Sequence, residues 1–229
     1  IAAGLLKKGC KVAGVDKFDD SAEVLESLFE NEGFTYFQYD LNDLEGMAAL
    51  VEKINAAMGG IDGMVNSAAY STRGPIDDVS YEDYDDYMLL NQKSLFFLVK
   101  TALPYIRAEG KGSIVNMSSL RSVQSDGRHV LYSMVKGAIV SFTRELAVCL
   151  APDHIRVNCI SPAYVLTPMT RHNLSREGWL EKQLESSLIG RLVEQEDVAA
   201  MAEFLISDES AGVTGQDLFV DGGTTIKRA

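Results

Sequence analysis

Short apolar segments of strand length alternate with longer segments of helical periodicity along this chain. The strand-length segments are rich in Val, Ile, Phe or Met and end in polar or small residues; they cover 10–16, 33–40, 61–69, 112–119, 155–162 and 216–223. Apolar residues recur at intervals of three and four over 43–58, 135–151 and 194–207, which is typical of amphipathic helices. Strands that alternate with helices pair in parallel, because each helix crosses over the sheet and covers one of its faces. The sequence therefore predicts a doubly wound, parallel α/β sheet in three α/β/α layers.

The composition is that of a single globular domain over residues 1–229, since no repeat, low-complexity tract or linker divides the chain. A net charge of −12 argues against nucleic acid or an anionic membrane as a partner. No apolar run reaches the length of a membrane span. Cys10, Cys149 and Cys159 show neither a disulfide pattern nor metal-ligand spacing. We therefore expect a cytoplasmic protein without a metal site.

Polar or small residues stand where five of the predicted strands end. In an open α/β sheet, ligands bind beyond the carboxyl ends of the strands. A single polar or small residue at a strand end also suits an ordinary turn, so the evidence for a ligand site is that five strand ends share this feature. The residues are Asp16, Asp40, Asn66–Ala69, Ser118–Ser119 and Ser161–Ala163. The pattern indicates a cofactor site along one edge of the sheet.

Tyr132 stands four residues before Lys136, where the chain turns helical. Four residues make about one helical turn, so the two side chains share a face of the helix. A free tyrosine titrates near pH ~10, and a neighbouring cation favours the phenolate and lowers that pKa. A phenol tuned in this way is a candidate general acid or base near neutral pH. Such a pair also arises by chance, so its meaning depends on the rest of the chain.

Two further residues set this pair in a longer pattern. Ser119 precedes Tyr132 by thirteen residues, and Asn91 precedes Ser119 by twenty-eight. With these spacings, and with the stretches GSIVNMSS, IRVNCISPAYVLTP and DLFVDGG, nearly the whole chain resembles the short-chain dehydrogenase/reductase family. The resemblance implies a Rossmann-type fold and a catalytic tetrad of Asn91, Ser119, Tyr132 and Lys136. It implies that Tyr132 transfers a proton, Lys136 binds the nicotinamide ribose and tunes Tyr132, Ser119 orients the substrate oxygen, and Asn91 holds a relay water.

The chain departs from the family pattern in its first residues. The family begins with a strand and a glycine-rich turn that holds the cofactor pyrophosphate, whereas IAAGLLKKGCKV resembles the helix that follows this turn. We expect a first strand and the glycine-rich turn upstream of residue 1, without which the sheet would have a gap. Ala69 and Ala163 also replace two glycines of the family pattern, and neither change removes a reacting group.

Asp16 closes a predicted strand where its carboxylate can accept hydrogen bonds from the adenosine ribose hydroxyls. The same charge repels a 2′-phosphate, so Asp16 favours NAD over NADP, although the neighbouring Lys17 could tolerate a phosphate. The expected cofactor is NAD. The other cofactor contacts that the resemblance implies are Asp40, Leu41, Asn66, Ala68, Tyr132, Lys136, Pro162, Val165 and Thr167.

Polar side chains around the expected pocket favour a sugar, a polyol or a sugar acid as the alcohol or ketone substrate. A guanidinium matches a carboxylate with two hydrogen bonds. The candidates are Arg121, Gln124, Arg171, His172 and Asn173, each of which would equally suit a solvated loop. Two alternatives stay open. One is an NADPH-dependent reductase of 3-oxoacyl thioesters on acyl carrier protein, and the other is a non-catalytic dinucleotide-binding sensor, which Tyr132 and Lys136 disfavour.

The resemblance also implies a homodimer or homotetramer in which helices over 91–103 and 134–150 pack against their copies. Residues 134–150 carry more apolar side chains than one stripe toward the chain's own sheet requires. They are Val135, Ala138, Ile139, Val140, Phe142, Leu146 and Leu150. A second axis through DLFVDGG, residues 217–223, would complete a tetramer.

Overall fold

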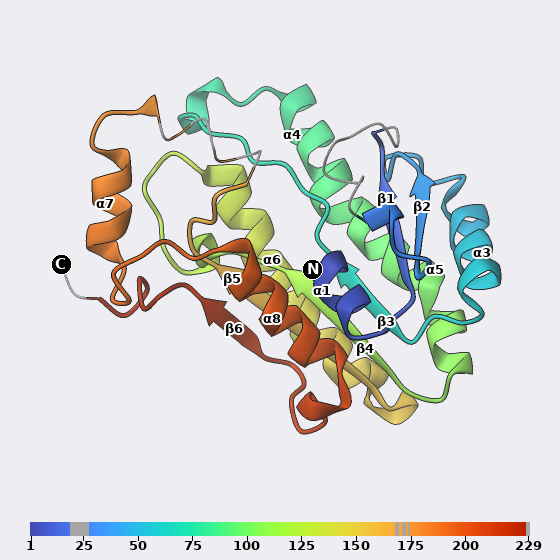
Figure 1. The fold of residues 1–229 in the computed structure, drawn as a ribbon. Helices are drawn as coiled ribbons and strands as arrows, with labels where there is room; N and C mark the ends of the chain where they lie inside the picture. Colours follow the sequence, from blue (N-terminus) through green and yellow to red (C-terminus); the bar gives the residue numbers. More distant parts are fainter. Residues whose placement is uncertain (19–27, 168–169, 171–172, 174, 228–229) are drawn as a thin grey trace.

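The computed structural model describes residues 1–18, 28–167, 170, 173 and 175–227. Figure 1 shows its strands between two layers of helices. The strands are β1 (Val12–Asp16), β2 (Phe34–Gln38), β3 (Gly63–Asn66), β4 (Gly112–Met117), β5 (Ile155–Pro162) and β6 (Asp217–Val220). Each of them lies within one of the segments predicted as strands, and the predicted α/β fold is confirmed.

The helices predicted from periodicity correspond to α3, α6 and α8, and α6 begins at Val130, earlier than the periodicity indicates. The α-helices are α1 (Ala2–Lys7), α3 (Met47–Met58), α4 (Tyr81–Met88), α5 (Leu95–Ala108), α6 (Val130–Leu150), α7 (Trp179–Ser186) and α8 (Gln195–Ile206). A π-helical turn, η2 (Leu89–Ser94), joins α4 to α5. The short 3-10 turns are η1 (Ile76–Asp78), η3 (Leu120–Ser122), η4 (Ala151–Asp153) and η6 (Asp208–Ser210).

The strands form two parallel sheets. In the smaller sheet, β1 pairs with β2 from Val12 opposite Phe34 to Asp16 opposite Gln38. The larger sheet has the order β3-β4-β5-β6, and all of its neighbours are parallel. Within the described residues, β1 and β3 do not pair with each other. The strand expected upstream of residue 1 stays a prediction.

Helices cover both faces of the larger sheet, and β4 shows how. Its neighbouring side chains Ile114 and Val115 are both fully buried and point to opposite faces, as successive residues of a strand do. Ile114 packs in a core with residues of α3, α5 and α6, whereas Val115 packs with residues of α8. Figure 1 shows α1 and α8 in front of the strands, and α5 and α6 behind them. With both faces covered, the carboxyl edge of the strands is left for the loops that carry functional side chains.

Among the helices that the structure describes, none combines the length and the hydrophobicity of a membrane-spanning segment. The described residues also contain no group of three or more His, Cys, Asp and Glu side chains arranged to hold a metal ion.

Candidate active site

Ser119 lies two residues after the end of β4, at the carboxyl edge of the larger sheet. Its backbone is extended, and its hydroxyl accepts a hydrogen bond from the Arg121 amide at 3.2 Å at the start of η3. The preceding Ser118 donates from its hydroxyl to the Lys136 carbonyl oxygen at 2.9 Å. This bond ties the end of β4 to α6. Ser119 is 8 % exposed, so its hydroxyl is fixed within the protein although it stands on a turn.

The helix α6 presents Tyr132 and Lys136 in its first two turns, on one face, as their spacing predicts. The Lys136 ammonium lies 5.4 Å from the centre of the Tyr132 ring. It donates a hydrogen bond to the Met117 carbonyl oxygen at 2.7 Å. Tyr132 also lies close enough to the Ser119 hydroxyl for that hydroxyl to lower the pKa of the phenol. The structure thus brings Ser119, Tyr132 and Lys136 together at the end of β4.

Burial dominates the titration of both α6 side chains. It raises the pKa of Tyr132, and the hydrogen bond with Ser119 and the charge of Arg121 oppose that rise. Burial lowers the pKa of Lys136 to about 8. In the protein alone, Lys136 is therefore not among the groups that lower the pKa of Tyr132, and the lowering expected from Lys136 together with the positive nicotinamide of the oxidised cofactor stays a prediction. The Lys136 ammonium bonds to a backbone carbonyl, and Arg121 is the cation that acts on the phenol.

Asn91 lies in the π-helical turn η2, a rare conformation that occurs often at functional sites. Its side chain donates to the Tyr87 carbonyl oxygen at 3.0 Å and accepts from the Tyr70 amide at 3.2 Å. Tyr87 belongs to the apolar cluster against which Tyr132 packs. The cluster around Tyr87 and the bond from Asn91 to the Tyr87 carbonyl oxygen therefore hold Asn91 near Tyr132. The relay water expected at Asn91 stays a prediction.

The predicted cofactor residues stand at the carboxyl ends of strands from both sheets. They are Asp16 at the end of β1, Asp40 and Leu41 after β2, Asn66 at the end of β3 with Ala68 beyond it, Pro162 at the end of β5, and Val165 and Thr167 beyond β5. Asn66 donates to the Asn116 side chain at 2.8 Å, and Asn116 donates to the Thr143 hydroxyl at 2.9 Å. This chain of bonds fixes the ends of β3 and β4 against α6.

The polar groups along this edge fit a nicotinamide dinucleotide. The Asp16 side chain is exposed at the end of β1 and accepts a long hydrogen bond from the Phe18 amide at 3.4 Å, so it can accept bonds from ribose hydroxyls. An ammonium has three donors, and within the described residues Lys136 uses one of them, toward Met117. Its remaining donors suit a second ribose beside Tyr132. The carboxyl edge of the strands therefore offers hydrogen-bond acceptors at Asp16 and hydrogen-bond donors at Lys136.

Two of the predicted substrate residues line a cavity of about 430 Å³, which Leu120, the neighbour of Ser119, also lines. The guanidinium of Arg121 donates to the Asp126 carboxylate at 2.9 Å and to the Tyr164 hydroxyl at 3.2 Å. Gln124 donates to the Thr224 carbonyl oxygen at 3.2 Å. One nitrogen of each side chain is thus tied to the cavity wall, and within the described residues the other N–H donors of the Arg121 guanidinium have no protein partner.

For the other predicted substrate residues, the structure adds no support for a contact with substrate. Arg171 and His172 lie outside the described residues. Asn173 is 9 % exposed and donates to the Thr170 carbonyl oxygen at 3.1 Å, so it closes a local turn. Sequence reasoning missed three arginines that line a second cavity: Arg73, Arg128 and Arg176. They stand in three separate loops, and no local spacing relates them.

The family to which the chain belongs follows from a comparison over nearly its full length. A model of related proteins, described as enoyl-(acyl carrier protein) reductase, matches residues 1–225. The chain belongs to the short-chain dehydrogenase/reductase family. It is therefore an NAD(P)-dependent oxidoreductase that acts on alcohols, as the sequence predicts.

Several short-chain dehydrogenases resemble the protein over most of their length. A 2-dehydro-3-deoxy-D-gluconate 5-dehydrogenase from Dickeya dadantii is 34 % identical, over 97 % of this chain and 88 % of that protein. An NAD-dependent glycerol dehydrogenase from Listeria innocua is 36 % identical, over 96 % of this chain and 86 % of that protein. The crystal structure of a gluconate 5-dehydrogenase from Burkholderia cenocepacia, in complex with NADP and tartrate, matches with a TM-score of 0.92 at 27 % identity, over 99 % of this chain and 90 % of that one.

Proposed function

We propose that the protein interconverts a secondary alcohol and a ketone on a small polyhydroxylated compound, with Tyr132 as the general acid and base. The compound is a sugar, a polyol or a sugar acid. The observation that carries this proposal is the convergence of Ser119, Tyr132 and the buried Lys136 at the end of β4. Two hydroxyl groups placed together in this way near a cavity are able to contact one substrate oxygen.

Each residue of the tetrad has a separate task in this reaction. Ser119 holds the substrate oxygen, and Tyr132 gives a proton to that oxygen in ketone reduction or takes one in alcohol oxidation. When bound, the nicotinamide supplies or accepts the hydride. Because burial raises its pKa, the Tyr132 phenol rests in the protonated form, which is the proton donor for ketone reduction. Lys136, with a pKa of about 8, can exchange a proton near neutral pH and restore Tyr132 after each turnover.

The cavity beside Ser119 supports a polar substrate. Charged and polar side chains form much of its wall, including Arg121, Asp126, Lys182, Arg191 and Asp221. Such a wall can bind hydroxyl and carboxylate groups, because the Arg121 guanidinium keeps N–H donors that have no protein partner within the described residues. The names of the gluconate and glycerol dehydrogenases among the relatives point to the same substrate class. The acyl-carrier-protein name of the family model supports the alternative, a 3-oxoacyl thioester reductase.

For the cofactor we propose a preference for NAD, carried by Asp16. Its exposed carboxylate ends β1, where it accepts hydrogen bonds from ribose hydroxyls and repels a 2′-phosphate. The neighbouring Lys17 places its ammonium over the Phe18 ring, 5.4 Å from the ring centre. That contact directs its charge toward Phe18. The relatives differ in this respect, since the glycerol dehydrogenase is NAD-dependent and the gluconate 5-dehydrogenase structure contains NADP.

A kinetic screen with both cofactors tests the function and the cofactor preference together. We expect kcat/KM for at least one polyol or aldonate with NAD to exceed that for a 3-oxoacyl thioester with NADPH by about tenfold or more. In Asp16→Ala the preference for NAD over NADP should shrink about tenfold, because repulsion and hydrogen bonds are both lost. Glu209→Ala, which removes a carboxylate from η6, is the control. Higher activity on the thioester would favour the alternative, and a wild-type preference for NADP would show that the Asp16 argument is wrong.

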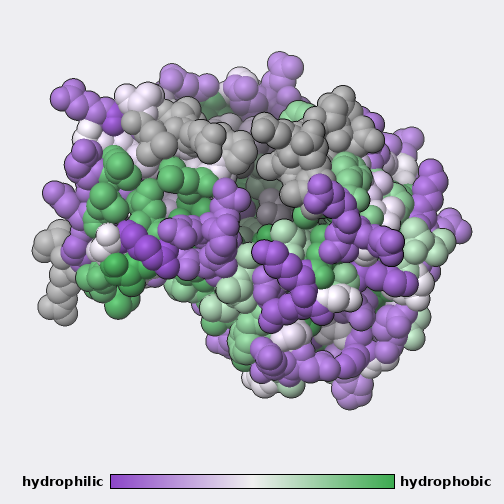
Figure 2. All heavy atoms as spheres, in the orientation of Figure 1, coloured by the Kyte–Doolittle hydropathy of each residue, from purple (hydrophilic) through white to green (hydrophobic). Residues whose placement is uncertain are grey.

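We also propose a homodimer or homotetramer, on evidence that differs from the expectation. Val135, Ile139 and Leu150 of α6 were expected to contact another copy of the chain, and this expectation is wrong. They are 0 %, 4 % and 0 % exposed and lie in the chain's own core. Exposed apolar side chains remain beside them, Phe96 at 48 % and Met134 at 43 %. Figure 2 shows a second group of apolar side chains over α7 and the nearby C-terminal segment. Its exposed members include Leu184, Leu188, Ile189, Phe219 and Ile226.

Sedimentation velocity tests the assembly. The exposed apolar groups on two separate faces should be covered by further copies, so we expect a dimer or tetramer at micromolar concentration. Met134→Lys places a charge on the α6 face, and it should shift the equilibrium toward smaller species without unfolding the chain. A fully active monomer in a dilute wild-type sample would refute the proposal.

A further inference from the structure

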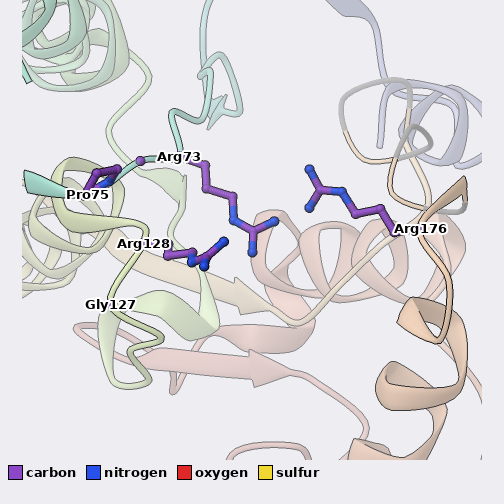
Figure 3. A pocket seen from close by; sticks show the side chains of 6 residues that line it. Arg73, Pro75, Gly127, Arg128 and Arg176 are labelled. Carbon is purple, nitrogen blue, oxygen red and sulfur yellow. The ribbon is translucent and has the colours of Figure 1, made fainter. Parts of the chain in front are cut away.

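Three arginine side chains converge on a cavity of about 650 Å³ next to the candidate active site. Figure 3 shows that Arg73, Arg128 and Arg176 direct their guanidinium groups toward one another from three different segments. The rest of the cavity wall comes from Gly74, Pro75 and Gly127. Among these lining residues, therefore, there is no carboxylate.

Backbone contacts hold two of the three segments together. The Gly74 amide donates to the Arg128 carbonyl oxygen at 3.0 Å, and Gly74 also forms an isolated parallel bridge with His129. These contacts place Arg73 beside Arg128, although the two residues are far apart in sequence. The relative position of Arg73 and Arg128 is therefore fixed by the backbone and does not depend on the side-chain conformation of surface residues.

The third arginine is fixed by the turn that leads into α7. The Arg176 amide donates to the Asn173 carbonyl oxygen at 3.1 Å, and the Arg176 carbonyl oxygen accepts from the Trp179 amide at 3.1 Å. The Trp179 ring packs edge-on against Tyr164, with 5.2 Å between the ring centres. Tyr164 in turn accepts a hydrogen bond from Arg121, in the wall of the neighbouring cavity.

The charges of the three arginines are not neutralised within the part of the chain that the structure describes. None of their guanidinium groups has an ion pair or hydrogen bond there, whereas Arg107, Arg121 and Arg191 each pair with an aspartate. Carboxylates line the adjoining cavity and not this one: Asp126, which accepts from the Arg128 amide at 3.1 Å, Glu177 and Asp221. Three like charges directed at one space repel each other, and an anion between them would relieve that repulsion. The feature also stands out in a chain whose net charge is −12.

The arginine cavity is continuous with the active-site region. Arg73 and Arg176 also line the cavity that contains Leu120 and Arg121, the residues that follow Ser119. On the other side, His129 follows Arg128 directly, and its ring centre lies 6.4 Å from that of Tyr132. A small molecule held by the arginines therefore extends toward the residues that handle the proton.

We propose that Arg73, Arg128 and Arg176 bind an oxyanion of the substrate, a carboxylate or a phosphate ester. The inference rests on the proposed function and narrows its substrate class to anionic polyhydroxylated compounds. Guanidinium groups pair with both oxyanions through parallel hydrogen bonds, so the shared chemistry defines the site. Binding of the anionic group by the arginines then decides which carbon of the substrate lies next to Tyr132. That carbon is the one that is oxidised or reduced.

Anion binding is measured first, without turnover. Sodium gluconate and inorganic phosphate, added separately at constant ionic strength, should raise the Tm of the wild-type protein. Arg73→Gln with Arg176→Gln should abolish this rise. The control, Lys7→Gln with Lys53→Gln, also removes two positive charges, from exposed residues of α1 and α3, and should keep the rise. The anion with the larger effect distinguishes a carboxylate from a phosphate site. An unchanged response in the double variant would overturn the proposal.

Steady-state kinetics then separate this inference from the proposed function. In Arg73→Gln and in Arg176→Gln, KM for gluconate or 6-phosphogluconate should rise about tenfold or more, while KM for neutral glucitol stays the same. Equal effects on glucitol and on the anions would overturn the arginine site and leave the proposed function standing. If the wild-type protein oxidises none of these compounds but still shows arginine-dependent anion binding, the proposed function fails and the anion site remains. A loss of NADP binding in the variants would instead assign the arginines to the cofactor phosphate and overturn the inference.

Discussion

Replacing Tyr132 with phenylalanine is expected to lower kcat at least ~10²-fold while cofactor binding persists. The substitution removes one oxygen atom, and that atom is the proton donor and acceptor of the proposed reaction. Ser119 cannot take over, because an aliphatic hydroxyl is a much weaker acid than a phenol near neutral pH. The loss should therefore appear in kcat with either direction of the reaction.

The fold should tolerate the Tyr132→Phe change. The ring packs against the apolar cluster of Tyr87, Leu131, Val135 and Ile139, and a phenyl ring keeps those contacts. Cofactor affinity, measured by fluorescence titration, should be close to wild type. Tyr84→Phe on α4 removes the same atom from a tyrosine that is 40 % exposed, and serves as the matched control. A Tyr132→Phe enzyme with near-normal kcat would show that another group carries the proton.

Lys136→Met is expected to abolish activity and, at pH 7, to make the protein more stable. Lys136 is 3 % exposed, and burial lowers its pKa from 10.5 to about 8. The folded protein therefore holds a charge at pH 7 that its surroundings disfavour. Methionine has a similar length and no charge, so it removes this penalty, although it also loses the hydrogen bond to Met117. The net gain in the free energy of unfolding should be about 1–3 kcal/mol.

The pH dependence gives this prediction its sharpest test. Below about pH 8 the lysine is protonated in both the folded and the unfolded protein, and the full penalty of burial applies. Between about 8 and 10.5 the folded protein has lost the proton and the unfolded chain has kept it, so the wild-type stability gains as pH rises. The stability difference between Lys136→Met and wild type should thus be largest below pH 8 and shrink toward pH 10.5. Other titrating groups are common to both proteins and cancel in the difference.

Urea unfolding of the wild type, Lys136→Met and the exposed control Lys53→Met at pH 7 and pH 9.5 measures this difference. The control should differ little from wild type at either pH. A Lys136→Met protein that is less stable than wild type at pH 7, or a difference that does not change with pH, would mean that burial of this charge does not limit stability. Retained activity would remove Lys136 from the catalytic set.

Much of the fold could be predicted because its signals are local. Each strand from β1 to β6 lies in an apolar segment that is recognisable by itself, and the alternation with helices requires parallel pairing. The prediction was weaker where periodicity is weak. The helix α6 begins at Val130 because its first turn packs Leu131 and Tyr132 against Tyr87, a residue of α4, and no local pattern shows that contact.

The candidate site divides in the same way. Spacing along the chain related Tyr132 to Lys136, and the family resemblance added Ser119; the structure brings the three residues together at the end of β4. The sequence did not show that Lys136 would bond to Met117, or that Arg121 would be the cation acting on Tyr132. Both depend on how α6 and the turn after β4 pack against each other.

The sequence by itself determined the order of strands and helices, because the hydrophobic period is a property of neighbouring positions, and its resemblance to the family selected the residues that we propose to meet at the carboxyl edge of the sheet. Only the tertiary structure decided the direction of the Tyr132 and Lys136 pKa shifts, since these depend on burial by distant segments. It also decided that Arg73, Arg128 and Arg176 share one cavity. Their convergence comes from the pairing of loops far apart in sequence, and charge repulsion acts through space, whatever the separation along the chain.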